Sequence, residues 1–126
     1  MAFDWSQYLT LAEEILGQST PLIDRECRYR ASIHLAYYAA FVSARNYLQD
    51  RKGCTFSKTG RVHQEVMSYF SKNLDSDYKR IGQNLKNLRT DRNKADYQNC
   101  VLDLAKKSHK SVKRSQEIIS LLVKII

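Results

Sequence analysis

The residues best suited to chemistry lie between Leu88 and Tyr97. Arg89, Arg92 and Asp96 are spaced three and four residues apart, so a continuous helix would present them side by side. An arginine near a carboxylate can bind a phosphate or stabilise charge that develops on a phosphoryl group. Asp96 could accept a proton or orient Arg92, while Tyr97 could stack on a base or donate its hydroxyl. These residue types suit metal-independent chemistry on an RNA phosphodiester.

The same stretch ends an apolar helix face, and this allows a second interpretation. Ile81, Leu85 and Leu88 follow the spacing of a buried stripe, which Arg92 then continues. A structural salt bridge at the end of a helix would use the same arginine and carboxylate as a site. Spacing alone therefore leaves a functional site and a structural ion pair both open.

Composition indicates one globular domain over residues 1–126, since 43% of the residues are hydrophobic and 27% are charged. The net charge is +8, and it is unevenly distributed. The first 50 residues hold four basic and six acidic side chains, while the remainder holds 17 basic and seven acidic ones. This asymmetry favours a polyanionic partner, of which RNA is one, although a solvated basic surface is the alternative. Lys110 and Lys113 are candidate phosphate contacts in the basic part.

Several classes of protein are disfavoured by what the sequence contains. Cys27, Cys54 and Cys100 are odd in number, widely spaced and without a CxxC pair, which is typical of neither a disulfide framework nor a zinc site. No HExxH motif or glycine-rich phosphate loop occurs, so we expect no metal and no cofactor. The N-terminal residues lack the pattern of a signal peptide, and no apolar run approaches the roughly 18 residues of a membrane span. We therefore expect a cytoplasmic protein with no membrane partner.

Hydrophobic periodicity predicts an all-α bundle of about five helices, because no segment shows the alternation typical of strands. Residues 35–42 are apolar on every side, which predicts a central helix covered by other helices and by a second subunit. Asp4 with Gln7 and Asn99 are the predicted N-terminal caps, and Gly53 is a predicted stop. The expected helices run from after Asp4 to before Gly17, from Ile23 or Asp24 to Arg51, from Thr59 to about Lys72, from Asp75 or Ser76 into Leu88–Tyr97, and onward from Asn99. In the last of these helices, the side chains expected to face the core are Val101, Ala105, Val112, Ile119, Leu122 and Ile126.

Three segments together resemble the HEPN superfamily. They are RASIHLAYYAAF at residues 30–41, SKT at 57–59 followed by His63, and RNKADY at 92–97. The closest resemblance is to small stand-alone prokaryotic HEPN proteins with an AYYAAF helix and an R-x-K-A-D-Y motif. It implies a helical bundle that pairs as a homodimer, with the motif helices facing one cleft. Many such proteins are metal-independent ribonucleases, and many are toxins encoded beside a minimal nucleotidyltransferase antitoxin.

The resemblance assigns roles to individual residues. Arg92 becomes the family arginine, and Tyr97 becomes the tyrosine that some antitoxins modify with AMP. The expected catalytic residues are Arg92, Asp96 and Tyr97, and the expected RNA- or nucleotide-binding residues are Arg89, Asn93, Lys94, His63, Lys110 and Lys113.

One departure from the family pattern affects the predicted activity. The family ribonuclease motif has a histidine four to six residues after its arginine, whereas Asp96 occupies that region here. Aspartate, with a usual pKa near 3.9, is a poor general acid at neutral pH, and histidine is a good one. His34 and His63 are the candidates for the missing imidazole, and the sequence does not choose between them. A toxin-type ribonuclease and a non-catalytic HEPN module that binds RNA, nucleotide or a partner nucleotidyltransferase both remain open.

Overall fold

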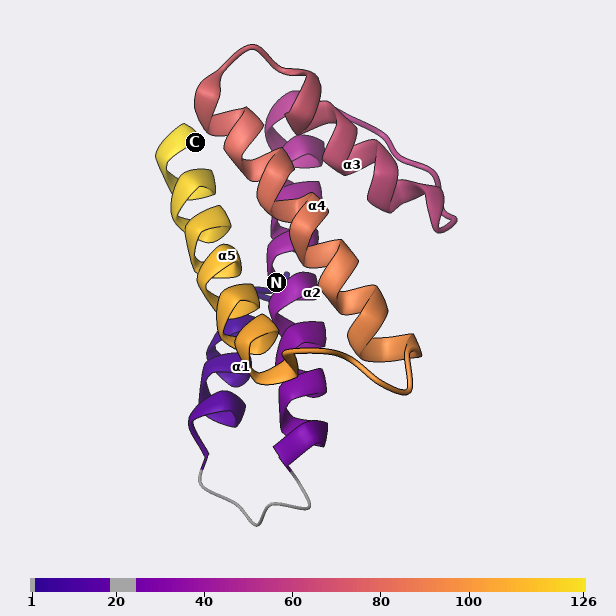
Figure 1. The fold of residues 1–126 in the computed structure, drawn as a ribbon. Coiled ribbons are helices and arrows are strands. Elements are labelled where there is room, and N and C mark those ends of the chain that lie inside the picture. The colour runs from indigo at the N-terminus through magenta and orange to yellow at the C-terminus, as the bar shows by residue number, and fades with distance from the viewer. Residues whose placement is uncertain (1, 19–24) are drawn as a thin grey trace.

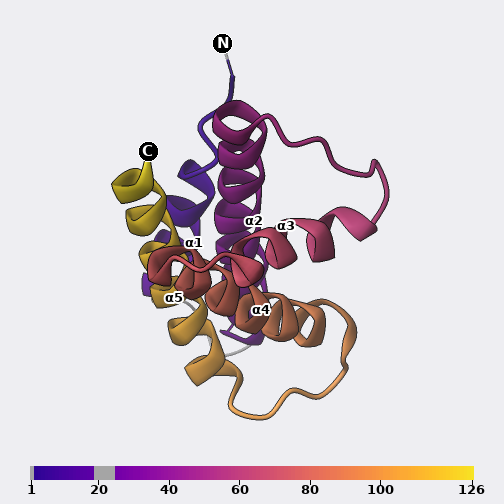
Figure 2. The same ribbon diagram turned by 90° about the horizontal axis from the view of Figure 1, so that it is seen from above.

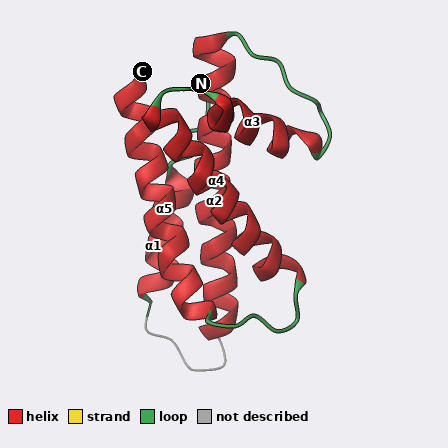
Figure 3. Ribbon diagram, turned by 45° about the horizontal axis from the view of Figure 1, so that its top comes forward, coloured by secondary structure: helices red, strands yellow, loops and turns green. Residues whose placement is uncertain are grey.

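The computed structural model describes residues 2–18 and 25–126 (Figure 1), and within these ranges it contains helices and loops but no strand (Figure 3). The all-α prediction is therefore confirmed. The expected start of the second helix, at Ile23 or Asp24, lies outside the described residues. The five helices in the described ranges are α1 (Gln7–Gly17), α2 (Arg25–Lys52), α3 (Arg61–Lys72), α4 (Ser76–Tyr97) and α5 (Leu104–Ile125).

Helix α2 is the centre of the bundle, as its apolar middle predicts. It contacts each of the other four helices, and α5, which runs alongside it, also packs against both α1 and α4 (Figures 1 and 2). Ile33, Ala36 and Ala40 are fully buried in it, and Gly53 ends the helix with a positive φ of 66°. Within the described residues, none of the helices combines the length and apolar character that crossing a bilayer requires.

Helices α3 and α4 form a hairpin in which the two helices pack closely together and α4 packs along α2. Helix α4 begins at Ser76, as predicted, and Asp75 caps it, because its carboxylate accepts hydrogen bonds from the backbone N–H groups of Asp77 and Tyr78. A Cβ atom at Gly82 would lie 2.8 Å from the backbone nitrogen of Ser71, so only glycine allows this approach of the two helices. Helix α4 then continues without interruption to Tyr97, which places the candidate residues on one rigid element.

Three of the predicted helix starts differ from the structure, those of α1, α3 and α5. Helix α1 begins at Gln7, and the Asp4 carboxylate accepts from the N–H and hydroxyl of Ser6 rather than capping the helix. Helix α3 begins at Arg61, two residues later than predicted, and the Thr59 hydroxyl accepts from the Arg61 N–H. In both cases a short polar side chain forms a turn just before the helix.

The predicted start of α5 at Asn99 is wrong. The helix begins at Leu104, after Asp103 adopts the left-handed conformation with φ of 54°. The Asn99 carbonyl instead accepts a hydrogen bond from Arg30. The inward stripe also differs, because Ile126 is exposed and Ile118, not Ile119, is fully buried. The buried residues of α5 are Ser108, Ser111, Val112, Ser115, Ile118 and Leu122.

Candidate functional site

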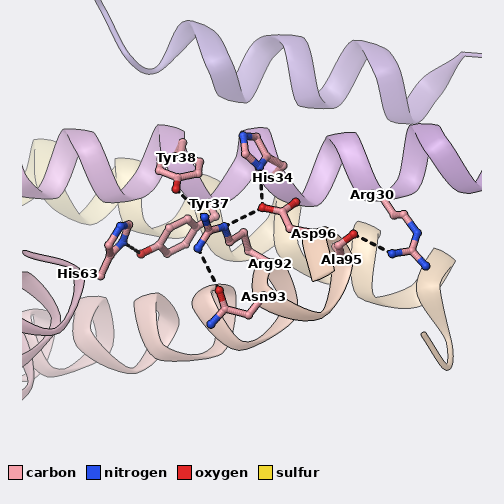
Figure 4. Close-up of polar contacts among 9 residues, drawn as sticks. All are labelled: Arg30, His34, Tyr37, Tyr38, His63, Arg92, Asn93, Ala95 and Asp96. Atoms are coloured by element: carbon pink, nitrogen blue, oxygen red, sulfur yellow. Dashed lines mark hydrogen bonds and ion pairs between the residues drawn. The ribbon is translucent and has the colours of Figure 1, made fainter. Parts of the chain in front are cut away.

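Arg92 is held by three polar partners on the side of α4 that faces α2 (Figure 4). Its Nε donates to Asp96 Oδ2 at 2.9 Å, and its Nη1 donates to Asn93 Oδ1 at 3.0 Å. Its Nη2 donates to the Tyr38 hydroxyl of α2 at 2.7 Å. The side chain is only 13% exposed. A guanidinium has five N–H groups, so two remain for a ligand after these three bonds.

Asp96 also joins a histidine from α2 to this arrangement. His34 Nδ1 lies 2.9 Å from the same oxygen, Asp96 Oδ2, that accepts from Arg92. A carboxylate only accepts hydrogen bonds, so the contact assigns the proton to Nδ1 and leaves Nε2 as the unprotonated nitrogen of the neutral ring. The His34 side chain is 44% exposed. The structure therefore presents an imidazole base whose tautomer and orientation depend on a carboxylate.

Aromatic rings surround the Arg92 guanidinium. Its central carbon lies 5.1 Å from the ring centroid of Tyr38, 5.6 Å from that of Tyr37 and 5.8 Å from that of Tyr97. These separations allow cation–π attraction, which holds the guanidinium in place. Tyr37 is almost completely buried, whereas Tyr97 is 74% exposed. Tyr97 therefore forms the outer edge of the site.

A second histidine reaches the same region from α3. The Tyr37 hydroxyl and His63 Nδ1 are 2.5 Å apart, and the His63 ring stacks on Phe41 with centroids 4.3 Å apart. Burial raises the pKa of the Tyr37 hydroxyl, although Arg89 and Arg92 act against this shift. Burial also lowers the pKa of His63, and the positive charges of Arg89 and Arg92 lower it further. The neutral imidazole of His63 is therefore favoured.

Arg30 fixes the end of α4 against α2. Its Nη1 donates to the carbonyl oxygens of Ala95 and Gln98 at 2.8 and 2.7 Å, and its Nη2 donates to that of Asn99 at 3.1 Å. These carbonyls have no helical partner beyond the last turn, so the arginine acts as a cap. A cavity of about 580 Å³ opens beside it. Its lining includes Cys27, Arg30, His34, Ala95 and Asp96.

The structure brings some of the predicted site residues together and separates others. Arg92 donates hydrogen bonds to both Asn93 and Asp96, and Arg89 is near enough to His63 to affect its pKa. Lys94 is half-buried on the same helix. Lys113 is exposed on α5, and Lys110 lines a different cavity, of about 250 Å³, between α4 and α5. The other residues of that cavity are Asp91, Asp103, Lys106, Lys107 and Arg114.

The sequence named His34 only as one of two candidates for the missing imidazole, and it gave Tyr37 and Tyr38 no role in the site. His34 and Tyr38 are four residues apart, so they share a face of α2, and this spacing was the available signal. Which face meets Arg92 depends on how α2 and α4 pack. Among residues 2–18 and 25–126, no cluster of three or more histidine, cysteine, aspartate or glutamate side chains could hold a metal ion.

Comparison with known families agrees with this helical arrangement. The sequence matches the HEPN domain over residues 5–126, which is nearly the whole chain. Neither the curated proteins nor the solved structures provided a match. The family match, which includes α2, α4 and every side chain of the Arg92 cluster, shows that the chain belongs to the HEPN domain family.

Proposed function

We propose that this HEPN protein is a metal-independent endoribonuclease of the toxin–antitoxin type, in which His34 replaces the motif histidine. The observation that carries the proposal is the shared oxygen Asp96 Oδ2, which lies 2.9 Å from both Arg92 Nε and His34 Nδ1. Asp96 occupies the motif region on α4, and it holds an imidazole from α2 beside the motif arginine. The site thereby contains the base that Asp96 alone would not supply.

The proposed reaction uses the ribose 2′ hydroxyl as the nucleophile. His34 Nε2 removes its proton, the 2′ oxygen forms a bond to phosphorus, and the bond from phosphorus to the 5′ oxygen breaks. The products are a 2′,3′-cyclic phosphate and a 5′ hydroxyl. The two remaining N–H groups of Arg92 stabilise the charge on the phosphoryl oxygens, and Asp96 stabilises the imidazolium of His34.

The leaving 5′ oxygen needs a proton from the opposite side of the phosphorus, and we propose that a homodimer supplies it. If the α2–α4 faces of two subunits meet across one cleft, the second subunit's His34 would lie on that side, and in its protonated imidazolium form it would donate the Nε2 proton to the 5′ oxygen. The 44% exposure of His34 and the cavity beside it are compatible with such a shared cleft. A monomeric protein with full activity would contradict this part of the proposal, and sedimentation at micromolar concentration measures it.

Cleavage of RNA in the presence of a chelator tests the activity. We expect wild-type protein to cut RNA to cyclic phosphate ends, and Arg92→Ala and His34→Ala to lose cleavage while keeping helical circular dichroism. His109→Ala is the matched control, because His109 is exposed on α5 and away from the cluster. Intact RNA after long incubation with the wild-type protein, or full activity of Arg92→Ala, would overturn the proposal.

A second candidate function is favoured by the position of Tyr97. Its ring is 74% exposed and lies 5.8 Å from the Arg92 guanidinium. In this alternative the protein is a non-catalytic module that binds RNA or nucleotide and presents Tyr97 to a minimal nucleotidyltransferase. Transfer of AMP from ATP to the Tyr97 oxygen, with release of diphosphate, would place a phosphate next to Arg92 and block the site.

Mass spectrometry distinguishes the two candidates when the partner enzyme from the neighbouring gene is added with ATP. The alternative predicts an AMP adduct that Tyr97→Phe abolishes and that Tyr69→Phe, at another exposed tyrosine, retains. An adduct on a protein that never cleaves RNA supports the binding module alone. An adduct that stops cleavage supports the ribonuclease and its antitoxin.

A further inference from the structure

His63 has a tautomer that differs from the one at His34. Within the described residues, the Tyr37 hydroxyl is buried and forms no hydrogen bond besides its 2.5 Å contact with His63 Nδ1, so its proton has an acceptor only if the hydroxyl donates to that nitrogen. A neutral imidazole that accepts at Nδ1 carries its own proton on Nε2. Within the described residues, Nε2 forms no hydrogen bond, and it is not enclosed by the protein. His63 therefore directs a fixed N–H donor away from Tyr37.

The charges around His63 are positive. Arg89 and Arg92 of α4 both lower its pKa, and the two tyrosines of α2 that contact it, Tyr37 and Tyr38, are neutral. Stacking on Phe41 at 4.3 Å restricts rotation of the ring. A fixed N–H donor whose ring is within electrostatic reach of Arg89 and Arg92 matches the oxygens of a phosphodiester, which accept hydrogen bonds and carry negative charge.

We propose that His63 Nε2–H donates to a non-bridging phosphate oxygen of single-stranded RNA, beside Arg89 and Arg92, and that Tyr37 is the positioning residue that keeps the proton on Nε2. This inference rests on the proposed function, because it takes RNA as the ligand of the Arg92 cluster. It assigns the two histidines different tasks. His34 exchanges a proton with the substrate, and His63 binds the phosphate without exchanging one.

The proposal has a consequence for protonation. An anion bound between His63 and the two arginines offsets the positive charge that disfavours the imidazolium. The pKa of His63 should therefore rise when RNA binds.

Nitrogen-15 NMR of the histidine rings tests the inference on the full-length protein. The probe is a single-stranded RNA with 2′-O-methyl groups, which binds but lacks the attacking hydroxyl. We expect the free protein to show the Nε2–H tautomer at His63, and the oligonucleotide to raise the pKa of that ring. Inorganic phosphate serves as a second ligand. A rise with phosphate but none with the oligonucleotide would overturn the assignment to RNA.

Variants give an independent measurement of the same hydrogen bond. His63→Ala should weaken binding of the 2′-O-methyl RNA about tenfold, as expected for a charge-assisted hydrogen bond. His63→Gln should recover part of the affinity, since its amide can donate from a similar place. Tyr37→Phe should weaken binding less than His63→Ala, and it should leave the His63 ring free to carry its proton on either nitrogen. Gln64→Ala, the exposed neighbour on α3, should bind like the wild type.

The outcomes separate this inference from the proposed function. If the pKa of His63 rises with the oligonucleotide and His63→Ala weakens binding, the inference holds even if no RNA is ever cleaved. If wild-type protein cleaves RNA but the pKa of His63 is unchanged and His63→Ala binds as tightly, the inference is wrong and the ribonuclease stands. The NMR measurement on wild-type protein remains decisive should a variant fail to fold.

Discussion

Arg30 Nη1 donates to the carbonyl oxygen of Ala95 across a distance of 2.8 Å, which joins the first third of α2 to the last turn of α4. Ala95 precedes Asp96, so the bond fixes the backbone of α4 directly beside the carboxylate that orients His34. The arginine and the histidine both lie on α2, four residues apart. The same helix therefore carries His34 and holds the element that carries its carboxylate partner.

We expect Arg30→Ala to lower the free energy of unfolding by about 1–3 kcal/mol, because the carbonyl oxygens of Ala95 and Gln98 lose a charged donor. Urea denaturation followed by circular dichroism measures the change. Arg25→Ala is the matched control, since Arg25 is an exposed arginine on the same helix. Equal midpoints for the two variants would show that the cap contributes nothing.

We expect Asp96→Asn to slow RNA cleavage by about 10²–10⁴-fold, since an amide neither selects the His34 tautomer in the same way nor stabilises its imidazolium. Steady-state cleavage of a fluorescent RNA measures the rate. Asp91→Asn changes a carboxylate on the same helix that pairs with Arg114 of α5 at 3.3 Å, outside the cluster. The idea fails if both variants lose activity to the same degree.

Stability should fall as the pH drops below the usual histidine pKa of 6.5, because His63 has a lower pKa in the folded protein than in the unfolded chain. In that interval the unfolded chain binds a proton that the folded protein does not, which favours unfolding. Above pH 6.5 both states are neutral at this ring and the effect disappears. We expect His63→Gln to show a smaller loss between pH 7 and the lower folded pKa. Thermal melts across this range measure it, and parallel curves would contradict it.

We expect the double substitution Lys110→Glu and Lys113→Glu to weaken the binding of RNA by a similar factor whatever the RNA sequence. The slope of log affinity against log salt should fall by about one for each phosphate that the protein no longer neutralises. Fluorescence anisotropy at several salt concentrations measures the slope. Lys72→Glu with Lys79→Glu, two exposed lysines near the turn between α3 and α4, gives the same change in net charge elsewhere. Identical slopes for both pairs would indicate a general charge effect and no role for α5 in binding.

The helices were predictable where local chemistry determines them. Asp75 caps α4 because its carboxylate reaches N–H groups two and three residues ahead, and Gly53 ends α2 because it adopts a positive φ. The start of α5 was not predictable in this way. Asn99 is a good capping residue, but Arg30 on another helix binds its carbonyl, and the helix begins only after Asp103.

The candidate site divides along the same line. Arg92 and Asp96 lie one turn apart on a single helix, so their contact follows from spacing. The bonds to Tyr38 and His34 cross 54 and 62 residues of chain. They depend on the register of α2 against α4, which hydrophobic periodicity does not specify. The buried serines of α5 illustrate the same limit, because small polar residues replace the apolar ones that the pattern favours.

The shared oxygen at Asp96 makes two residues thermodynamically dependent on one another. Arg92 Nε and His34 Nδ1 compete for lone pairs of one atom, so strengthening either hydrogen bond weakens the other. When His34 takes up a proton, its hydrogen bond to Asp96 gains charge and draws the carboxylate away from the guanidinium. In the proposed reaction, Arg92 would then be less neutralised when charge accumulates on the phosphate. The effects of substituting these two residues should accordingly be far from additive.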